Sequence, residues 1–161
     1  MEQPYFYANQ GYNFNRLPRK TITIKLDTSV TSKVYSLHEP ITIDQHSDIF
    51  IDSFITNNMA TTSGDTDIFI LDIKDFNIQS VSNEPKYNNK ILIPNTVGPP
   101  DDPPAGTTNT VAHRATKFNF VSSINPTKLT SLEISLTNNA STPAALSGTA
   151  YITFMIVARD K

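Results

Sequence analysis

Apolar and polar residues alternate along most of the chain with the period of two that is typical of half-buried β-strands. Residues 21–27 show the pattern first, because Ile22, Ile24 and Leu26 fall on one face and polar residues stand between them. No stretch carries an apolar stripe with the helical period of 3.6. The same alternation predicts further strands at residues 33–37, 41–43, 49–56, 67–78, 90–93, 116–122, 129–137 and 149–159.

About eight or nine short strands at nearly regular spacing, in a chain of 161 residues, predict one all-β domain built as a sandwich or barrel. The last strand, at 149–159, is apolar on both faces, with Ile152 and Phe154 on one and Met155 and Val157 on the other. This pattern predicts that it lies in the middle of a sheet, or that another subunit covers its outer face.

Residues 1–20 lack either period, and we interpret them as an extended arm before a domain of residues 21–161. The arm contains five aromatic residues and ends in a basic run. Aromatic residues are scarce in solvated tails, so we expect the arm to contact a partner subunit. The residues expected to make subunit contacts are Tyr5, Phe6, Tyr7, Tyr12, Phe14, Arg16, Arg19 and Lys20.

A second segment without periodicity, residues 94–114, is rich in proline and glycine and is predicted to be a long loop. Loops of this length inside a compact domain commonly carry function.

Composition excludes several classes of function. The formal net charge is -2, so we expect no nucleic-acid partner of the kind that a globally basic domain binds. The absence of cysteine excludes disulfides, thiolate metal sites and a cysteine nucleophile. The first 20 residues hold no apolar core of a signal peptide. No apolar run approaches the length of about 18 residues that a membrane span needs.

Candidate catalytic and metal-binding residues are few. Asp44, His46 and Asp48 alternate, so in a strand they would share one face and could bind a metal; a polar turn is the alternative. Gly64–Asp67 matches only part of a calcium loop. Asp101–Asp102 are adjacent in the long loop, whereas glycoside hydrolysis needs carboxylates that face each other. No serine lies in a Gly-x-Ser-x-Gly motif. We therefore expect no enzyme activity, no metal site and no cofactor.

The last third of the chain resembles the penultimate strands of single jelly-roll capsid proteins of large icosahedral double-stranded DNA viruses and virophages. The similar stretch begins at Phe118 and contains an Ile-Asn-Pro-Thr-Lys corner, followed by a strand that ends in Leu-Thr-Asn. The corner, the strand, a polar turn and a final apolar strand lie at Ile124–Lys128, Leu132–Asn138, Asn139–Gly148 and Ala150–Arg159.

This resemblance implies a single eight-stranded antiparallel jelly-roll sandwich with an extended N-terminal arm, acting as a structural virion protein. A chain of 161 residues has room for one jelly roll, so the pentameric vertex (penton) protein fits better than a double jelly-roll major capsid protein. The implied partners are copies of the chain itself, with a pentamer favoured, and neighbouring capsid proteins including a major capsid protein. The implied location is the virion capsid, assembled in the interior of the host cell.

Two other functions stay open on the sequence alone. One is a carbohydrate- or receptor-binding β-sandwich module; the chain has no tryptophan to stack on sugars, but its tyrosines can take that role. The other is an enzyme whose site contains Asp44, His46 and Asp48, which metal analysis of the purified protein would test.

Overall fold

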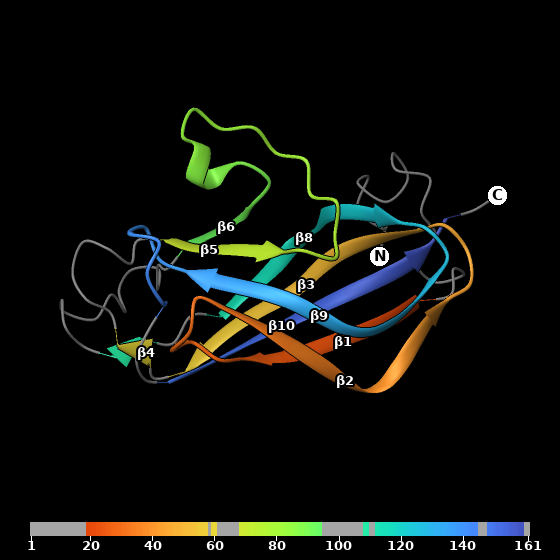
Figure 1. Ribbon diagram of the computed structural model, residues 1–161, viewed down its shortest axis with the longest axis horizontal. Coiled ribbons are helices and arrows are strands. Elements are labelled where there is room, and N and C mark those ends of the chain that lie inside the picture. The colour runs from red at the N-terminus through yellow and green to blue at the C-terminus, as the bar shows by residue number, and fades with distance from the viewer. Residues whose placement is uncertain are drawn as a thin grey trace, which may run out of the picture.

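The computed structural model describes residues 19–57, 59–60, 68–94, 108–109, 112–144 and 148–159. Within these ranges the chain forms two antiparallel four-stranded sheets packed face to face (Figure 1). Sheet A has the strand order β1-β10-β3-β8, and sheet B has the order β2-β9-β5-β6. The all-β sandwich predicted from the alternation is therefore confirmed.

The strands of sheet A are β1 (Arg19–Leu26), β10 (Thr149–Ala158), β3 (Ser47–Asn57) and β8 (Ala112–Ile124). The strands of sheet B are β2 (Ser32–Ile43), β9 (Thr127–Thr137), β5 (Ile68–Ile73) and β6 (Ile91–Pro94). The other described elements are a two-residue pair, β4 (Met59–Ala60) with β7 (Thr108–Asn109), and the 3-10 helix η1 (Pro85–Tyr87). No helix in these ranges is long and apolar enough to cross a membrane.

The chain passes from one sheet to the other at almost every connection. Sheets A and B alternate from β1 through β2, β3 and β5, and again from β8 through β9 to β10. The shortest of these corners is Asn125-Pro126, which joins β8 to β9. Pro126 suits this position, because proline cannot donate to a ladder and no ladder bond is made at the corner. The corner of the sequence motif is thus the point where the chain crosses between the sheets.

The core lies between the two sheets, where one face of each strand is apolar. Phe154 of β10 is fully buried (0% exposed), and its ring meets that of Phe76 edge-on, with 5.4 Å between the centroids. The prediction that the last strand is central is confirmed, since β10 lies between β1 and β3. Met155 and Val157, on the opposite face of β10, are buried as well but do not belong to the inter-sheet core.

Several strand boundaries differ from the sequence prediction. β2 continues through Pro40 instead of dividing there, because β2 is an edge strand and a register shift between Ser36 and Ile41 accommodates the proline. β5 ends at Ile73 rather than at residue 78, since the N–H of Phe76 turns back to the oxygen of Ile73 at 3.2 Å.

The two segments without periodicity are described only in part. β1 begins at Arg19, so Arg19 and Lys20, which the sequence prediction counts with the arm, are strand residues. The end of the predicted 94–114 loop is β7 and the first residues of β8. The arm before Arg19 and most of this loop lie outside the described residues.

Candidate functional site

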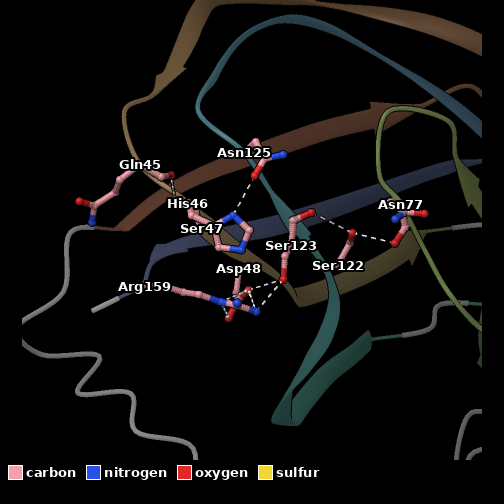
Figure 2. Close-up of polar contacts among 9 residues, drawn as sticks. All are labelled: Gln45, His46, Ser47, Asp48, Asn77, Ser122, Ser123, Asn125 and Arg159. Atoms are coloured by element: carbon pink, nitrogen blue, oxygen red, sulfur yellow. Dashed lines mark hydrogen bonds and ion pairs between the residues drawn. The ribbon is translucent and has the colours of Figure 1, made fainter. Parts of the chain in front are cut away.

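Polar side chains gather at the end of sheet A where β3 begins and β8 and β10 end (Figure 2). Asp48 of β3 lies at the centre, with a side chain only 1% exposed. Arg159, directly after β10, donates from Nε to both carboxylate oxygens of Asp48 at 2.9 and 3.0 Å. Ser123 of β8 donates to Oδ1 of Asp48 at 2.6 Å and accepts from Nη2 of Arg159 at 2.8 Å. These three side chains join the ends of three strands.

The strand register explains why these residues meet. Asp48 pairs with Val157 on one side and with Ser123 on the other, so the three positions form one row across sheet A. Arg159 stands two residues beyond Val157 and reaches back over this row. The carboxylate accepts charge-assisted hydrogen bonds from both neighbours, which is how a buried charge is made tolerable.

A second link joins the two chain corners beside this network. His46 lies between β2 and β3, and its backbone oxygen accepts the N–H of Arg159 at 3.0 Å. Its Nδ1 lies 3.0 Å from Oδ1 of Asn125 at the β8–β9 corner. An amide oxygen can only accept, so Nδ1 carries the proton in this contact. His46 therefore ties one corner to the other and to the end of β10.

A serine, a histidine and an aspartate thus lie close together, but not in the arrangement of nucleophilic catalysis. In a catalytic triad the histidine bonds to both the serine and the carboxylate. Here Ser123 bonds directly to Asp48, while Nδ1 of His46 faces Asn125. Arg159 neutralises the carboxylate that accepts the hydrogen bond from the serine hydroxyl. Nothing in this network activates Ser123, so its geometry supports a structural role.

The three residues considered for a metal site do not converge. Asp44 pairs with Lys20 at 3.4 Å, His46 bonds to Asn125, and Asp48 is held by Arg159. Among the residues that the structure describes, no group of three or more His, Cys, Asp or Glu side chains could hold a metal ion. The other acidic candidates, at 64–67 and 101–102, lie outside those residues.

Of the residues predicted to make subunit contacts, Arg19 and Lys20 are described. Arg19 is exposed on β1, opposite Val157. Lys20 donates to the backbone oxygen of Thr42 and forms the ion pair with Asp44, so in the single chain it links β1 to the end of β2. The others lie outside the described residues, and their subunit contacts stay a prediction: Tyr5, Phe6, Tyr7, Tyr12, Phe14 and Arg16.

An exposed charged cluster lies at the other end of β1. Oδ1 of Asp27 accepts the hydroxyl of Ser29 at 2.6 Å and its N–H at 3.2 Å, while Nζ of Lys33 lies 3.0 Å from Oδ2. The hydroxyl bond from Ser29, followed by the bond from Lys33, lowers the pKa of Asp27 from 3.8 to about 2. The cluster stabilises a tight connection between β1 and β2.

A third carboxylate, Asp72 of β5, lies between two lysines. Lys74 donates to its Oδ2 at 2.7 Å, and Lys90 forms an ion pair with the same oxygen. Burial pushes the pKa of Asp72 upward, but the hydrogen bonds from Lys74 and Lys90 outweigh it and lower the pKa below its usual value. Lys90 is therefore held at the start of β6 by a partner on the neighbouring strand.

A cleft of about 480 Å³ opens between the edges of the two sheets. One wall is residues 120–123 of β8, and the other is residues 77–80 with Lys90 and Ile91. The hydroxyl of Ser122 donates to the backbone oxygen of Asn77 at 2.9 Å and bridges the walls at one point (Figure 2). Phe120 is 55% exposed on the rim, and its ring meets that of Phe50 edge-on at 5.9 Å. Sequence periodicity did not indicate this cleft, because its walls are far apart along the chain.

Comparison with known proteins assigns no family to the chain. A scan against protein-family models finds no match, and a search of curated proteins finds no significant match. The function therefore has to be inferred from the strand order, the polar network and the cleft.

Proposed function

We propose that the chain is a structural virion protein, a single jelly-roll capsid subunit that assembles as the pentameric vertex (penton) protein. The observation that carries this proposal is the nested pairing of the strands. β1 pairs with β10, β2 with β9, β3 with β8 and β5 with β6. The first half of the chain thus pairs with the second half in reverse order, as in a long hairpin rolled into two sheets. A jelly roll is built in this way, and capsid domains use it.

Two features of the described residues favour assembly over catalysis. The buried network around Asp48 satisfies its own hydrogen bonds and offers no activated nucleophile. The Asn125-Pro126 corner, which carries the family resemblance, joins β8 to β9 directly and is tied to His46. A fold does not dictate function by itself, so these local features are needed beside the strand order.

In the proposed assembly, copies of the domain pack side by side around a five-fold axis. Each copy contributes the same pair of surfaces, and the aromatic arm before β1, residues 1–18, adds a contact to a neighbour. Individually weak contacts become strong when several must break at once. Neighbouring capsid proteins, including a major capsid protein, would enclose this ring in the virion.

The mass of the full-length protein in solution tests the proposal. Five copies of the 17.9-kDa chain give about 90 kDa, and native mass spectrometry or analytical ultracentrifugation should detect that species. A protein that stays monomeric at high concentration and never co-sediments with virus particles would contradict the proposal.

A carbohydrate- or receptor-binding module is the second candidate, and the cleft is the observation that favours it. Phe120, whose side chain is exposed, lines the cleft together with the polar residues Asn77 and Gln79. Aromatic faces and amide groups are the usual contacts of a bound sugar. A specific signal on a glycan array, lost in Phe120→Ser, would favour this function over the capsid subunit.

A further inference from the structure

We propose that the cleft between β6 and β8 receives the N-terminal segment, residues 1–18, of a neighbouring copy of the chain. This inference rests on the proposed function, because it names the contact that links one subunit to the next. It also accounts for the exposure of Phe120 at the rim of the cleft.

The walls of the cleft suit an extended peptide. Within the described residues β8 pairs on one side only, with β3, and residues 120–123 at the end of β8 line the cleft. An extended peptide can hydrogen-bond to such an edge while its side chains enter flanking pockets. The lining offers both apolar and polar contacts, from Ile78, Ile91, Phe120 and Val121 and from Asn77, Gln79 and Ser80. Its volume, about 480 Å³, lies within the range of about 300–1,000 Å³ typical of ligand pockets.

The composition of residues 1–18 matches this lining. The segment contains the aromatic residues Tyr5, Phe6, Tyr7, Tyr12 and Phe14 together with several Asn and Gln residues. Aromatic rings pack well against an exposed ring such as Phe120, which Phe50 already holds edge-on. Amide side chains can pair with Asn77 and Gln79. The lysine of the cleft, Lys90, is occupied by Asp72, so the site is not built to capture an anion.

The positions of β1 and β8 favour a contact between copies. They are the two opposite edges of sheet A, and β1 begins at the end of the sandwich where β8 finishes (Figure 1). If the β1 edge of one copy faces the β8 edge of the next, the segment before Arg19 starts beside the neighbour's cleft. Within one copy the segment would instead have to cross β10 and β3, about 14 Å, which 18 extended residues can also span, so isotope-labelled cross-linking distinguishes the two arrangements. A contact between two different surfaces is heterologous, and such contacts form a ring when the rotation from one copy to the next closes, as it does around a five-fold axis.

Photochemical cross-linking of the full-length protein tests the inference. Benzoylphenylalanine is placed at position 120, and equal amounts of isotopically heavy and light protein are mixed before irradiation. The expected result is a cross-link from position 120 to a peptide within residues 1–18. It should join heavy to light peptides as well as peptides of the same label, because a mixed pair can form only between two copies. The matched control is the same probe at Val34, which is 58% exposed on sheet B.

Two results would overturn the inference. One is cross-links that join position 120 only to the same chain or to other segments. The other is a yield into residues 1–18 no higher than that from position 34. Detection of a pentamer in solution would still support the proposed function in either case. A strictly monomeric protein would contradict both the proposed function and the contact between residues 1–18 and the cleft.

A pair of substitutions gives a second readout that does not depend on the probe. Phe120→Ser should weaken self-association at least about tenfold, as expected for a central aromatic contact. Val34→Ser should leave it within about twofold, because Val34 lies on β2, at the edge of sheet B opposite the β6 edge that borders the cleft. Equal dilution curves for the two variants would overturn the inference, and so would a specific saccharide that binds the cleft and is lost in Phe120→Ser.

Discussion

At the level of single residues, two aspartates show how position decides the role of a carboxylate. Asp48 is buried and accepts hydrogen bonds from Arg159 and Ser123, so its charge is compensated inside the domain. Asp27 is held by Ser29 and Lys33 at the surface, where water screens the ion pair. Removing a partner of Asp48 should therefore lower the free energy of unfolding. Removing a partner of Asp27 should mainly shift the pKa of Asp27.

The Asp27 cluster gives a prediction on pH. The pKa of Asp27 should be about 2 in the folded protein, against 3.8 in the unfolded chain. Because the folded pKa is the lower one, the stabilisation is complete above 3.8 and is lost as the pH falls through 2. Ser29→Ala should raise the pKa toward 3.8, since the hydroxyl bond is its largest cause. A carboxyl-detected NMR titration measures this, with Ser32→Ala as the control that should leave the pKa of Asp27 unchanged, because the Ser32 hydroxyl faces Glu133.

The Asp48 network gives a prediction on stability. Arg159→Ala leaves a buried carboxylate with fewer donors and should lower the free energy of unfolding by about 1.5–3 kcal/mol. Lys128→Ala, at an exposed position of β9, should change it by less than about 0.5 kcal/mol. Denaturant unfolding measures both. If Arg159→Ala were as mild as Lys128→Ala, water would be replacing the guanidinium and the network would not join the strands.

At the level of elements, the strands themselves are the part that sequence periodicity predicts well. Inward-facing residues such as Ile22, Ile24 and Phe154 are buried where the alternation places them. The prediction of two strands on either side of Pro40 was wrong. Proline is tolerated in an edge strand such as β2, and the local sequence does not show which strands lie at an edge. The order of strands depends on pairings between distant segments, which a pattern within one segment does not specify.

The candidate site was harder to predict for the same reason. Asp48 and Arg159 are 111 residues apart, and register alone brings them together. The spacing of Asp44, His46 and Asp48 suggested a shared face, but their partners come from three other segments. The one local signal that coincides with the network is the Asn125-Pro126 corner.

The central strand of sheet A gives a matched pair of substitutions. Phe154→Ala should lower the free energy of unfolding by about 3–5 kcal/mol, because it leaves a cavity between the sheets. Tyr151→Ala on the opposite face of β10, where Tyr151 is 39% exposed, should cost clearly less. Both values follow from denaturant unfolding. A cost below about 1 kcal/mol for Phe154→Ala would contradict its position in the core.

At the level of the whole molecule, several features lie at one end of the sandwich. β1 begins there, β8 and β10 end there, and the network of Asp48 and Arg159 links β3, β8 and β10 (Figure 1). The pairing of β1 with β10 joins β1 to the same group of strands. Residues 1–18 therefore attach at the end of sheet A that the proposed contact between copies requires.

Deleting residues 1–18 separates a role in folding from a role in assembly. The described core runs from Ile22 to Ile156, so the shortened chain should still fold, and its melting temperature as a monomer should fall by less than about 2 °C. The species of about 90 kDa should be lost. Deleting residues 1–20 is the contrasting variant, because it also removes Arg19 and Lys20 from β1 and should lower the melting temperature further. If the 1–18 deletion destabilised the monomer as strongly, the segment would pack on its own domain and the contact between copies would have to lie elsewhere.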